Sequence, residues 1–286
     1  RFINEKLMTP FKRISLLTIS MSFALPVFAQ TFALKNINIV DVEGLKIDNN
    51  QTVVIENDSI KSITATNKQR LSKDVVVLDM TDKYLIPGLI DTHVHHATSP
   101  DSGDNDQVTR MRLRKLLQGG VTSVRDMGGD TRALYSLKRR ADNDVIQSPD
   151  IYYSVIIGGD EFFSDPRTVE SAKGEIPGQV NWMRAVDEDS PFDEIMLKAS
   201  GAGATGIKIY AKVPASVIPK LAAAAKKHGL KVWSHAFVGP ARPQQLVNAG
   251  VETISHAPDL SAHVVDNFYQ LRRENKHITE KQKAES

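Results

Sequence analysis

Apolar and polar positions alternate in short runs along the part of the chain that follows residue 30. Polar turns, one of them Glu56-Asn57-Asp58, separate these runs. The runs are Phe32–Val40, Thr52–Glu56, Ile60–Ala65 and Val75–Leu78. Short alternating runs bounded by turn residues are typical of β-strands with one buried face. Residues 30–84 are therefore predicted to form a small antiparallel sheet, part of a β-sandwich domain.

From Tyr84 onward the pattern changes to apolar strands that alternate with helices. Helices are predicted over Asp104–Leu117, Ser190–Gly201, Pro214–His228 and Pro240–Ala249, with Ser190 as a cap. The predicted strands are Tyr84–Asp91, Thr122–Asp126, Ile151–Ile157, Gly206–Ala211, Lys231–His235 and Glu252–His256. Repeated βα units build a parallel sheet. The fold class expected for residues 85–268 is therefore α/β, a TIM-type (β/α) barrel with about six of the eight units.

One segment, Gly158–Ser190, departs from this repeat because it is long, polar and rich in Asp, Glu, Gly and Pro. Loops of this length in a compact domain are usually functional lids or disordered segments. The segment follows the third barrel strand. We expect it to lie at the face where barrel enzymes place their active sites.

The two ends of the chain differ from the rest. Lys12 and Arg13 precede an apolar stretch, Ile14–Phe28, and a small residue, Ala29, follows it. This order is typical of a secretory signal peptide, with a buried N-terminal helix as the alternative. Residues 1–29 are interpreted as upstream sequence plus a signal that starts at Met8. We expect a protein exported to the periplasm, without a membrane anchor after cleavage. Residues 269–286 are predicted to be a charged tail.

Composition excludes several classes of function. The chain has 286 residues and a net charge of +2, without a dense stripe of Lys and Arg, so nothing favours a nucleic-acid partner. Cysteine is absent, which excludes disulfides, thiolate metal ligands and a cysteine nucleophile.

Four histidines and one lysine fall at the ends of predicted barrel strands. His93 and His95 are two residues apart in an extended segment, so both rings point to the same side. Lys208 lies between apolar residues that face the helices, so it must point into the barrel, where a buried ammonium needs a partner or a changed charge. His235 and His256 end the fifth and sixth strands. Each residue alone also fits a structural role, but together they predict a metal site at the carboxyl-end rim of the barrel.

The motifs YLIPGLIDTHVHH, GVTSVRDMGG, ATGIKIY, SHAF and NAGVETISHA occur in this order along the chain. The set resembles the metal-dependent amidohydrolase superfamily, and in particular its imidazolonepropionase-like branch, which includes prolidase-like and Xaa-Arg dipeptidases. This resemblance implies hydrolysis of carbon–nitrogen bonds, with dipeptides or N-acyl amino acids as the expected substrates. Cyclic amides are the alternative.

The same resemblance implies a site with two divalent ions, zinc by default. His93 and His95 would bind the first ion and His235 and His256 the second, and Lys208, carboxylated by carbon dioxide, would bridge them. Lys208 and His256 are the expected catalytic residues. Tyr210 is a candidate for substrate contact, and the pair Arg125-Asp126 is expected to form an ion pair or to support the site.

The sequence departs from the family pattern at its C-terminal end. The family has an aspartate at the end of an eighth barrel strand, and no residue after His256 matches it, because Asp259 and Asp266 lie too close to the sixth strand. Strands seven and eight also lack counterparts. The alternatives are therefore an inactive truncated fragment, or a chain completed by self-association or by a complementing C-terminal fragment.

Overall fold

The computed structural model describes residues 31–97 and 105–263, and only the backbone of 261–263. The chain divides into two compact units, one ending at Pro87 and the other beginning at Gly88. The predicted signal peptide and charged tail lie outside the described residues, so export stays a prediction. No helix in the described ranges has the length and apolar character needed to cross a membrane.

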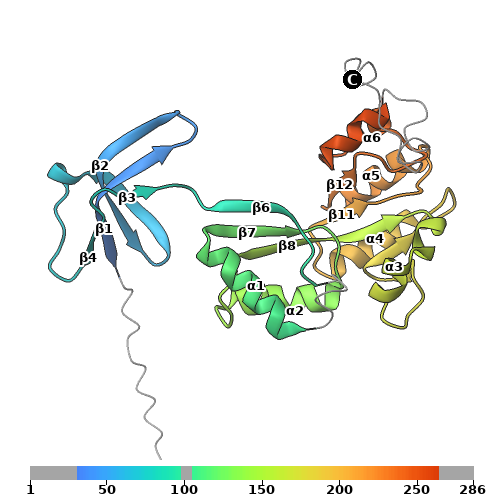
Figure 1. Cartoon of the computed structure of the whole chain (residues 1–286), viewed down its shortest axis with the longest axis horizontal. Coiled ribbons are helices and arrows are strands. Elements are labelled where there is room, and N and C mark those ends of the chain that lie inside the picture. Colours follow the sequence, from blue (N-terminus) through green and yellow to red (C-terminus); the bar gives the residue numbers. More distant parts are fainter. Residues whose placement is uncertain (1–30, 98–104, 264–286) are drawn as a thin grey trace, which may run out of the picture. The chain divides into compact units, whose positions relative to one another are not determined.

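The first unit is a five-stranded sheet (Figure 1). Its strands are β1 (Phe32–Asp41), β2 (Lys46–Glu56), β3 (Ser59–Ala65), β4 (Val76–Asp79) and β5 (Tyr84–Leu85). The first three strands pair antiparallel, and β4 and β5 join β1 in parallel. The turn between β2 and β3 uses Asn57 and Asp58, both with positive φ, as tight hairpins require. The 3-10 turn η1 (Thr66–Lys68) follows β3.

The second unit contains a curled parallel sheet that forms half of a barrel (Figure 1). Its strands, in spatial order, are β6 (Leu89–Val94), β7 (Val121–Asp126), β8 (Asp150–Gly158), β11 (Gly206–Ile209), β12 (Lys231–His235) and β13 (Thr253–Ser255). Sequential strands are thus spatial neighbours, which confirms the predicted fold class. Within the described part of the chain, β6 and β13 each pair on one side only.

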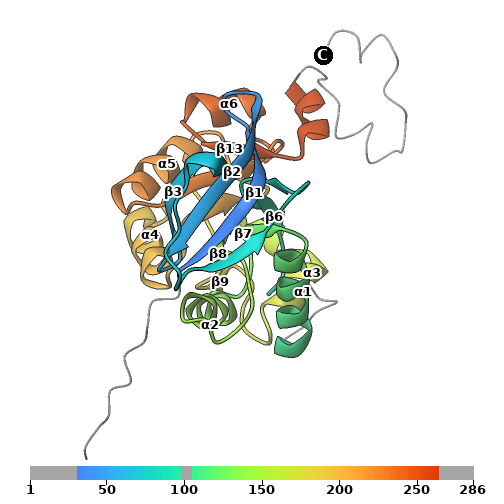
Figure 2. The ribbon, with the colours of Figure 1, turned by 90° about the vertical axis from the view of Figure 1, so that its left-hand side faces the viewer.

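Helices cover the outer face of this sheet (Figure 2). They are α1 (Asp106–Gln118), α2 (Thr131–Asp142), α4 (Phe192–Gly201), α5 (Val217–Lys227) and α6 (Pro243–Asn248). The apolar core lies between them and the outward strand residues, such as Ile157, Ile207 and Val232. Helix α2 was not predicted, because only Leu134 and Leu137 of its twelve residues are large apolar residues buried in the core.

The segment Gly158–Ser190 contains regular secondary structure. It contains η2 (Asp160–Ser164), α3 (Pro166–Ser171), β9 (Gln179–Val180) and β10 (Met183–Ala185), and β10 extends the sheet beside the end of β8. We call this segment the lid. Its own apolar cluster comprises Phe163, Ala172, Val180, Trp182 and Met183 together with Ile156 of β8. Isolated apolar residues in a polar stretch are thus sufficient here for a small core.

Two local predictions differ from the structure. The predicted strand Tyr84–Asp91 divides into β5 and β6, because Pro87 lacks an N–H and a Cβ on Gly88 would lie 2.0 Å from the Thr122 hydroxyl oxygen. Ser190 does not cap α4. Its hydroxyl oxygen instead accepts the Asp187 N–H at 2.9 Å, and the helix follows Pro191.

Candidate metal centre

The four predicted histidines lie side by side at the carboxyl ends of β6, β12 and β13. The ring centroids of His93 and His95 are 5.2 Å apart, those of His93 and His256 5.0 Å, and those of His256 and His235 4.5 Å. His256 reaches this row from a left-handed backbone conformation, with φ of 66° directly after β13. Residues as far apart in sequence as His93 and His256 therefore lie in one contiguous row.

His93 and His95 direct their Nε2 atoms toward each other, at 3.3 Å. The Nδ1 atom of His95 lies 3.2 Å from the carbonyl oxygen of Gly128. Because a carbonyl only accepts hydrogen bonds, Nδ1 carries a proton and donates it. In the Nδ1-protonated tautomer, the lone pair of Nε2 faces His93.

Lys208 lies in β11 on the inward side, with its side chain fully buried. Among the described residues its Nζ atom has no hydrogen-bond partner, and neither has the buried Nε2 atom of His235. Burial, with a smaller contribution from Arg125, lowers the pKa of Lys208 to about 7. Burial and the charge of Lys208 lower the pKa of His93 to about 4 and that of His235 to about 2. The rings of His93 and His235 are therefore neutral at physiological pH.

Tyr210 connects the row of histidines to the lid. Its ring lies 4.2 Å from that of His235 and stacks on Phe162 of the lid at 5.1 Å. Burial raises the pKa of Tyr210 to about 12, so the phenol keeps its proton. Sequence reasoning missed Phe162; the adjacent pair Phe162-Phe163 at the start of a polar segment was the available signal.

Arg125 and Asp126 point to opposite sides of β7 and make separate contacts rather than an ion pair. Asp126 is 1% exposed and accepts the backbone N–H groups of His96 at 2.7 Å and Gly128 at 3.3 Å. The guanidinium of Arg125 lies 4.6 Å from the centre of the Trp233 ring, and its Nε donates to the carbonyl of Thr92 at 2.8 Å. Both residues join neighbouring strands.

The arrangement of the donor atoms bears on whether the site can hold a metal ion. Within residues 31–97 and 105–263, no group of three or more His, Cys, Asp or Glu side chains is arranged to hold an ion as it stands. The Nε2 atoms of His93 and His95 nevertheless have the separation of about 3.3 Å expected for two nitrogens bound ~2.05 Å from one tetrahedral zinc ion. Nζ of Lys208 and Nε2 of His235 are buried and have no hydrogen-bond partner among the described residues, so both remain available as further donors. The donor set therefore fits divalent cations.

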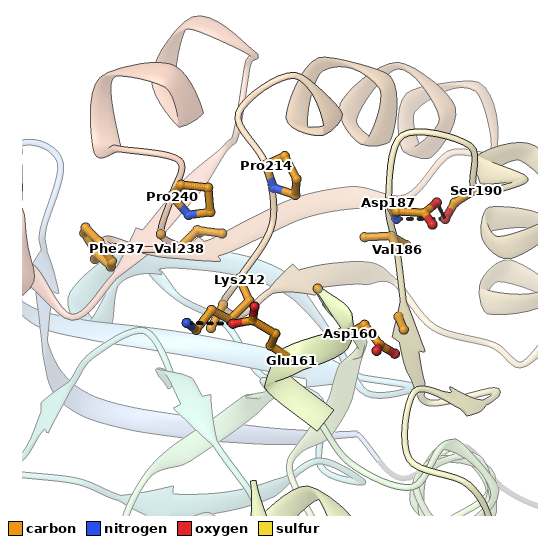
Figure 3. A pocket seen from close by; sticks show the side chains of 14 residues that line it. Asp160, Glu161, Val186, Asp187, Ser190, Lys212, Pro214, Phe237, Val238 and Pro240 are labelled. Atoms are coloured by element: carbon orange, nitrogen blue, oxygen red, sulfur yellow. Dashed lines mark hydrogen bonds and ion pairs between the residues drawn. The ribbon is translucent and has the colours of Figure 1, made fainter. Parts of the chain in front are cut away.

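A cavity of about 900 Å³ lies at the carboxyl ends of β8, β11 and β12 (Figure 3). The lid contributes Asp160, Glu161 and Asp187 to its wall, and the strand ends contribute Lys212 and Phe237. Lys212 and Glu161 form an ion pair at 3.0 Å. None of the four histidines lines the cavity, so it is a separate space.

The half-barrel with its inward row of histidines defines an incomplete (β/α) barrel whose carboxyl-end rim gathers imidazole nitrogens. The sequence model described as "Amidohydrolase family" matches residues 84–284, and the chain belongs to this family. This membership confirms the resemblance drawn from the motifs. No curated protein sequence matches the chain.

Solved structures share the fold. A crystal structure titled as an uncharacterized protein is 26% identical, with a TM-score of 0.65, over 79% of this chain and 60% of that one. A second structure with the same designation is a prolidase complexed with N-methylphosphonate-L-proline. It is 22% identical, with a TM-score of 0.66, and the match covers 90% of this chain and 72% of that one. A Xaa-Pro dipeptidase with bound methionine in its active site is 18% identical, with a TM-score of 0.64, and the match covers 84% of this chain and 65% of that one. The chain thus spans about 60% of the length of the first of these proteins.

Proposed function

We propose that this chain is a metal-dependent hydrolase of amide bonds that acts on dipeptides or N-acyl amino acids. The observation that carries the proposal is the row of four histidines beside a buried, unpartnered Lys208 in a member of the amidohydrolase family. This family is generally metal-dependent. Two structural neighbours are a prolidase and a Xaa-Pro dipeptidase, which supports small amide substrates.

The proposed ligands are those that the family resemblance implies, and the order of the rings in the row is compatible with them. His93 and His95 would hold one ion, and His235 and His256 a second. Zinc suits a donor set of imidazoles and oxygen. Bound divalent ions supply polarisation of the substrate carbonyl and a lowered pKa for a water molecule. Lys208 and His256 are the proposed catalytic residues, because each would contact an ion.

Lys208 is proposed to act as a carbamate. With its pKa lowered to about 7, much of the amine is neutral and nucleophilic at neutral pH. Its nitrogen adds to the carbon of carbon dioxide, the electron pair of one C=O bond moves to oxygen, and the nitrogen loses one proton. This exchange replaces a buried cation by an anion that two divalent ions neutralise.

Tyr210 is proposed to contact the substrate. Its protonated phenol can donate a hydrogen bond, and the stacked ring of Phe162 supports it from the lid.

In the reaction, water adds across the C–N bond. The hydroxyl group goes to the carbonyl carbon, and a proton goes to the leaving nitrogen.

The test uses the full chain, stripped with a chelator and loaded with zinc or manganese in bicarbonate. We expect metal to be retained after dialysis, and dipeptides to be hydrolysed faster than cyclic amides of the imidazolone type. Faster hydrolysis of the cyclic amides would favour the alternative substrate class. Loss of all metal on dialysis would contradict the ligand assignment. Metal retention without turnover would support the ligand assignment and contradict the proposed hydrolysis.

A further inference from the structure

Asp126 is a buried carboxylate that joins two strand ends. Its Oδ2 accepts the backbone N–H of His96 at 2.7 Å, just after β6. Its Oδ1 accepts the backbone N–H of Gly128 at 3.3 Å, just after β7. With 1% of its surface exposed, the carboxylate has little access to water, so these N–H groups provide its hydrogen bonds within the chain. Asp126 thereby fixes the segment after His95 and the peptide of Gly128 together.

Gly128 carries this constraint to His95 through its backbone. Its N–H, in the peptide bond to Met127, donates to Asp126, and its carbonyl, in the peptide bond to Gly129, accepts the Nδ1 proton of His95 at 3.2 Å. The remaining nitrogen, Nε2, faces Nε2 of His93 at 3.3 Å. Rotation of the Gly128–Gly129 peptide would remove the acceptor and free the ring of His95 to exchange tautomers.

The position of Gly128 requires the absence of a side chain. Its φ is +137°, and a Cβ there would lie 2.6 Å from Cγ1 and 2.8 Å from Cδ1 of Ile156. Any other residue would push the peptide away from β8 and with it the carbonyl that holds His95. The glycine is therefore part of the same arrangement as the carboxylate.

We propose that Asp126 is a positioning residue that acts through the backbone of Gly128 to hold His95 in the Nδ1-protonated tautomer. Only the consequence for metal affinity rests on the proposed function. The tautomer is a property of the metal-free chain. Hydrogen bonds to the second nitrogen of a histidine ligand typically change metal affinity 10- to 100-fold.

The test reads the tautomer by long-range ¹H–¹⁵N NMR on the metal-free full chain with labelled histidine. We expect His95 to be protonated on Nδ1 in the unmodified chain and to become a mixture in Asp126→Asn, whose amide cannot accept both N–H groups. The matched control is Asp130→Asn. Asp130 is also buried, at 3% exposure, but it caps α2 and pairs with Arg132. This control should leave the His95 signals unchanged.

A second arm measures zinc affinity with a competing chromophoric chelator. We expect a 10- to 100-fold loss in Asp126→Asn and less than twofold in Asp130→Asn. Gly128→Ala should reproduce the tautomer mixture with the carboxylate intact, which covers a failure of Asp126→Asn to fold. Protonation on Nε2 in the unmodified chain, or an unchanged tautomer in both variants, would overturn the proposal. Altered tautomers in a chain that binds no zinc would support the positioning role and reject the proposed function.

Discussion

The Nε2 atoms of His93 and His95 lie 3.3 Å apart while Nδ1 of His95 donates to the carbonyl of Gly128. Since Nε2 of a neutral His95 can only accept, the hydrogen bond between the two rings requires a proton on Nε2 of His93. A cation bound at both Nε2 atoms would have to displace that proton. The two Nε2 atoms therefore already have a separation close to that needed to bind one ion. In the metal-free chain, a hydrogen bond between the two rings maintains this separation.

The first prediction concerns removal of a ligand. His93→Ala should lower zinc affinity more than about 100-fold, because it removes one donor and the partner of His95. His228→Ala is the matched control, since His228 lies at the end of α5 and contacts Asp193 instead. Equilibrium dialysis with elemental analysis measures both variants. Equal zinc content in the two would exclude His93 as a ligand.

The second prediction concerns the buried lysine. Between pH 7 and 10.5 the unfolded chain binds a proton at Lys208 that the folded chain has lost, so the free energy of unfolding rises with pH in this window. At pH 7 Lys208→Met should therefore stabilise the metal-free chain, by roughly 2 to 4 kcal/mol. Urea denaturation in bicarbonate-free buffer should show this gain shrinking toward pH 10.5. A gain independent of pH would argue against a depressed pKa.

The third prediction concerns acid. The pKa of His235 is lowered to about 2 and that of His93 to about 4, from the usual histidine value of 6.5. Below pH 6.5 these two histidines bind protons in the unfolded chain but not in the folded chain. The free energy of unfolding therefore falls as the pH falls from 6.5 toward 4. His235→Phe should flatten this dependence, as measured by urea denaturation at pH 7, 5.5 and 4.5. The same slope in the variant and the unmodified chain would contradict the burial of a neutral His235.

The fourth prediction concerns the core of the lid. Phe163 is 5% exposed within the lid cluster, and Phe163→Ala should destabilise the lid by about 3 kcal/mol. Limited proteolysis should then cut within residues 159–190 before the rest of the second unit unfolds. Val169→Ala, on the same segment but 52% exposed, is the control and should be cut no faster than the unmodified chain. Resistance in Phe163→Ala would mean that the lid does not depend on its own core.

Much of the barrel could be predicted because its signals are local. Strands β8 and β11 lie in apolar runs of the sequence, and the period of two places Lys208 inward between Ile207 and Ile209. The lid could not be predicted in the same way. Its core combines Phe163 of η2, Val180 of β9 and Met183 of β10 with Ala172 and Trp182 from connecting segments, and none of these segments has an apolar pattern of its own.

The sequence by itself determined which residues reach the rim: His93, His95, Lys208, His235 and His256 follow from strand order and from alternation along each strand. Only the tertiary structure decided what these residues contact. The hydrogen bond from His95 to Gly128 spans 33 positions, and the stack of Phe162 on Tyr210 joins two separate elements. Such contacts depend on how neighbouring strands align and how side chains fill the space between them, which no local pattern encodes.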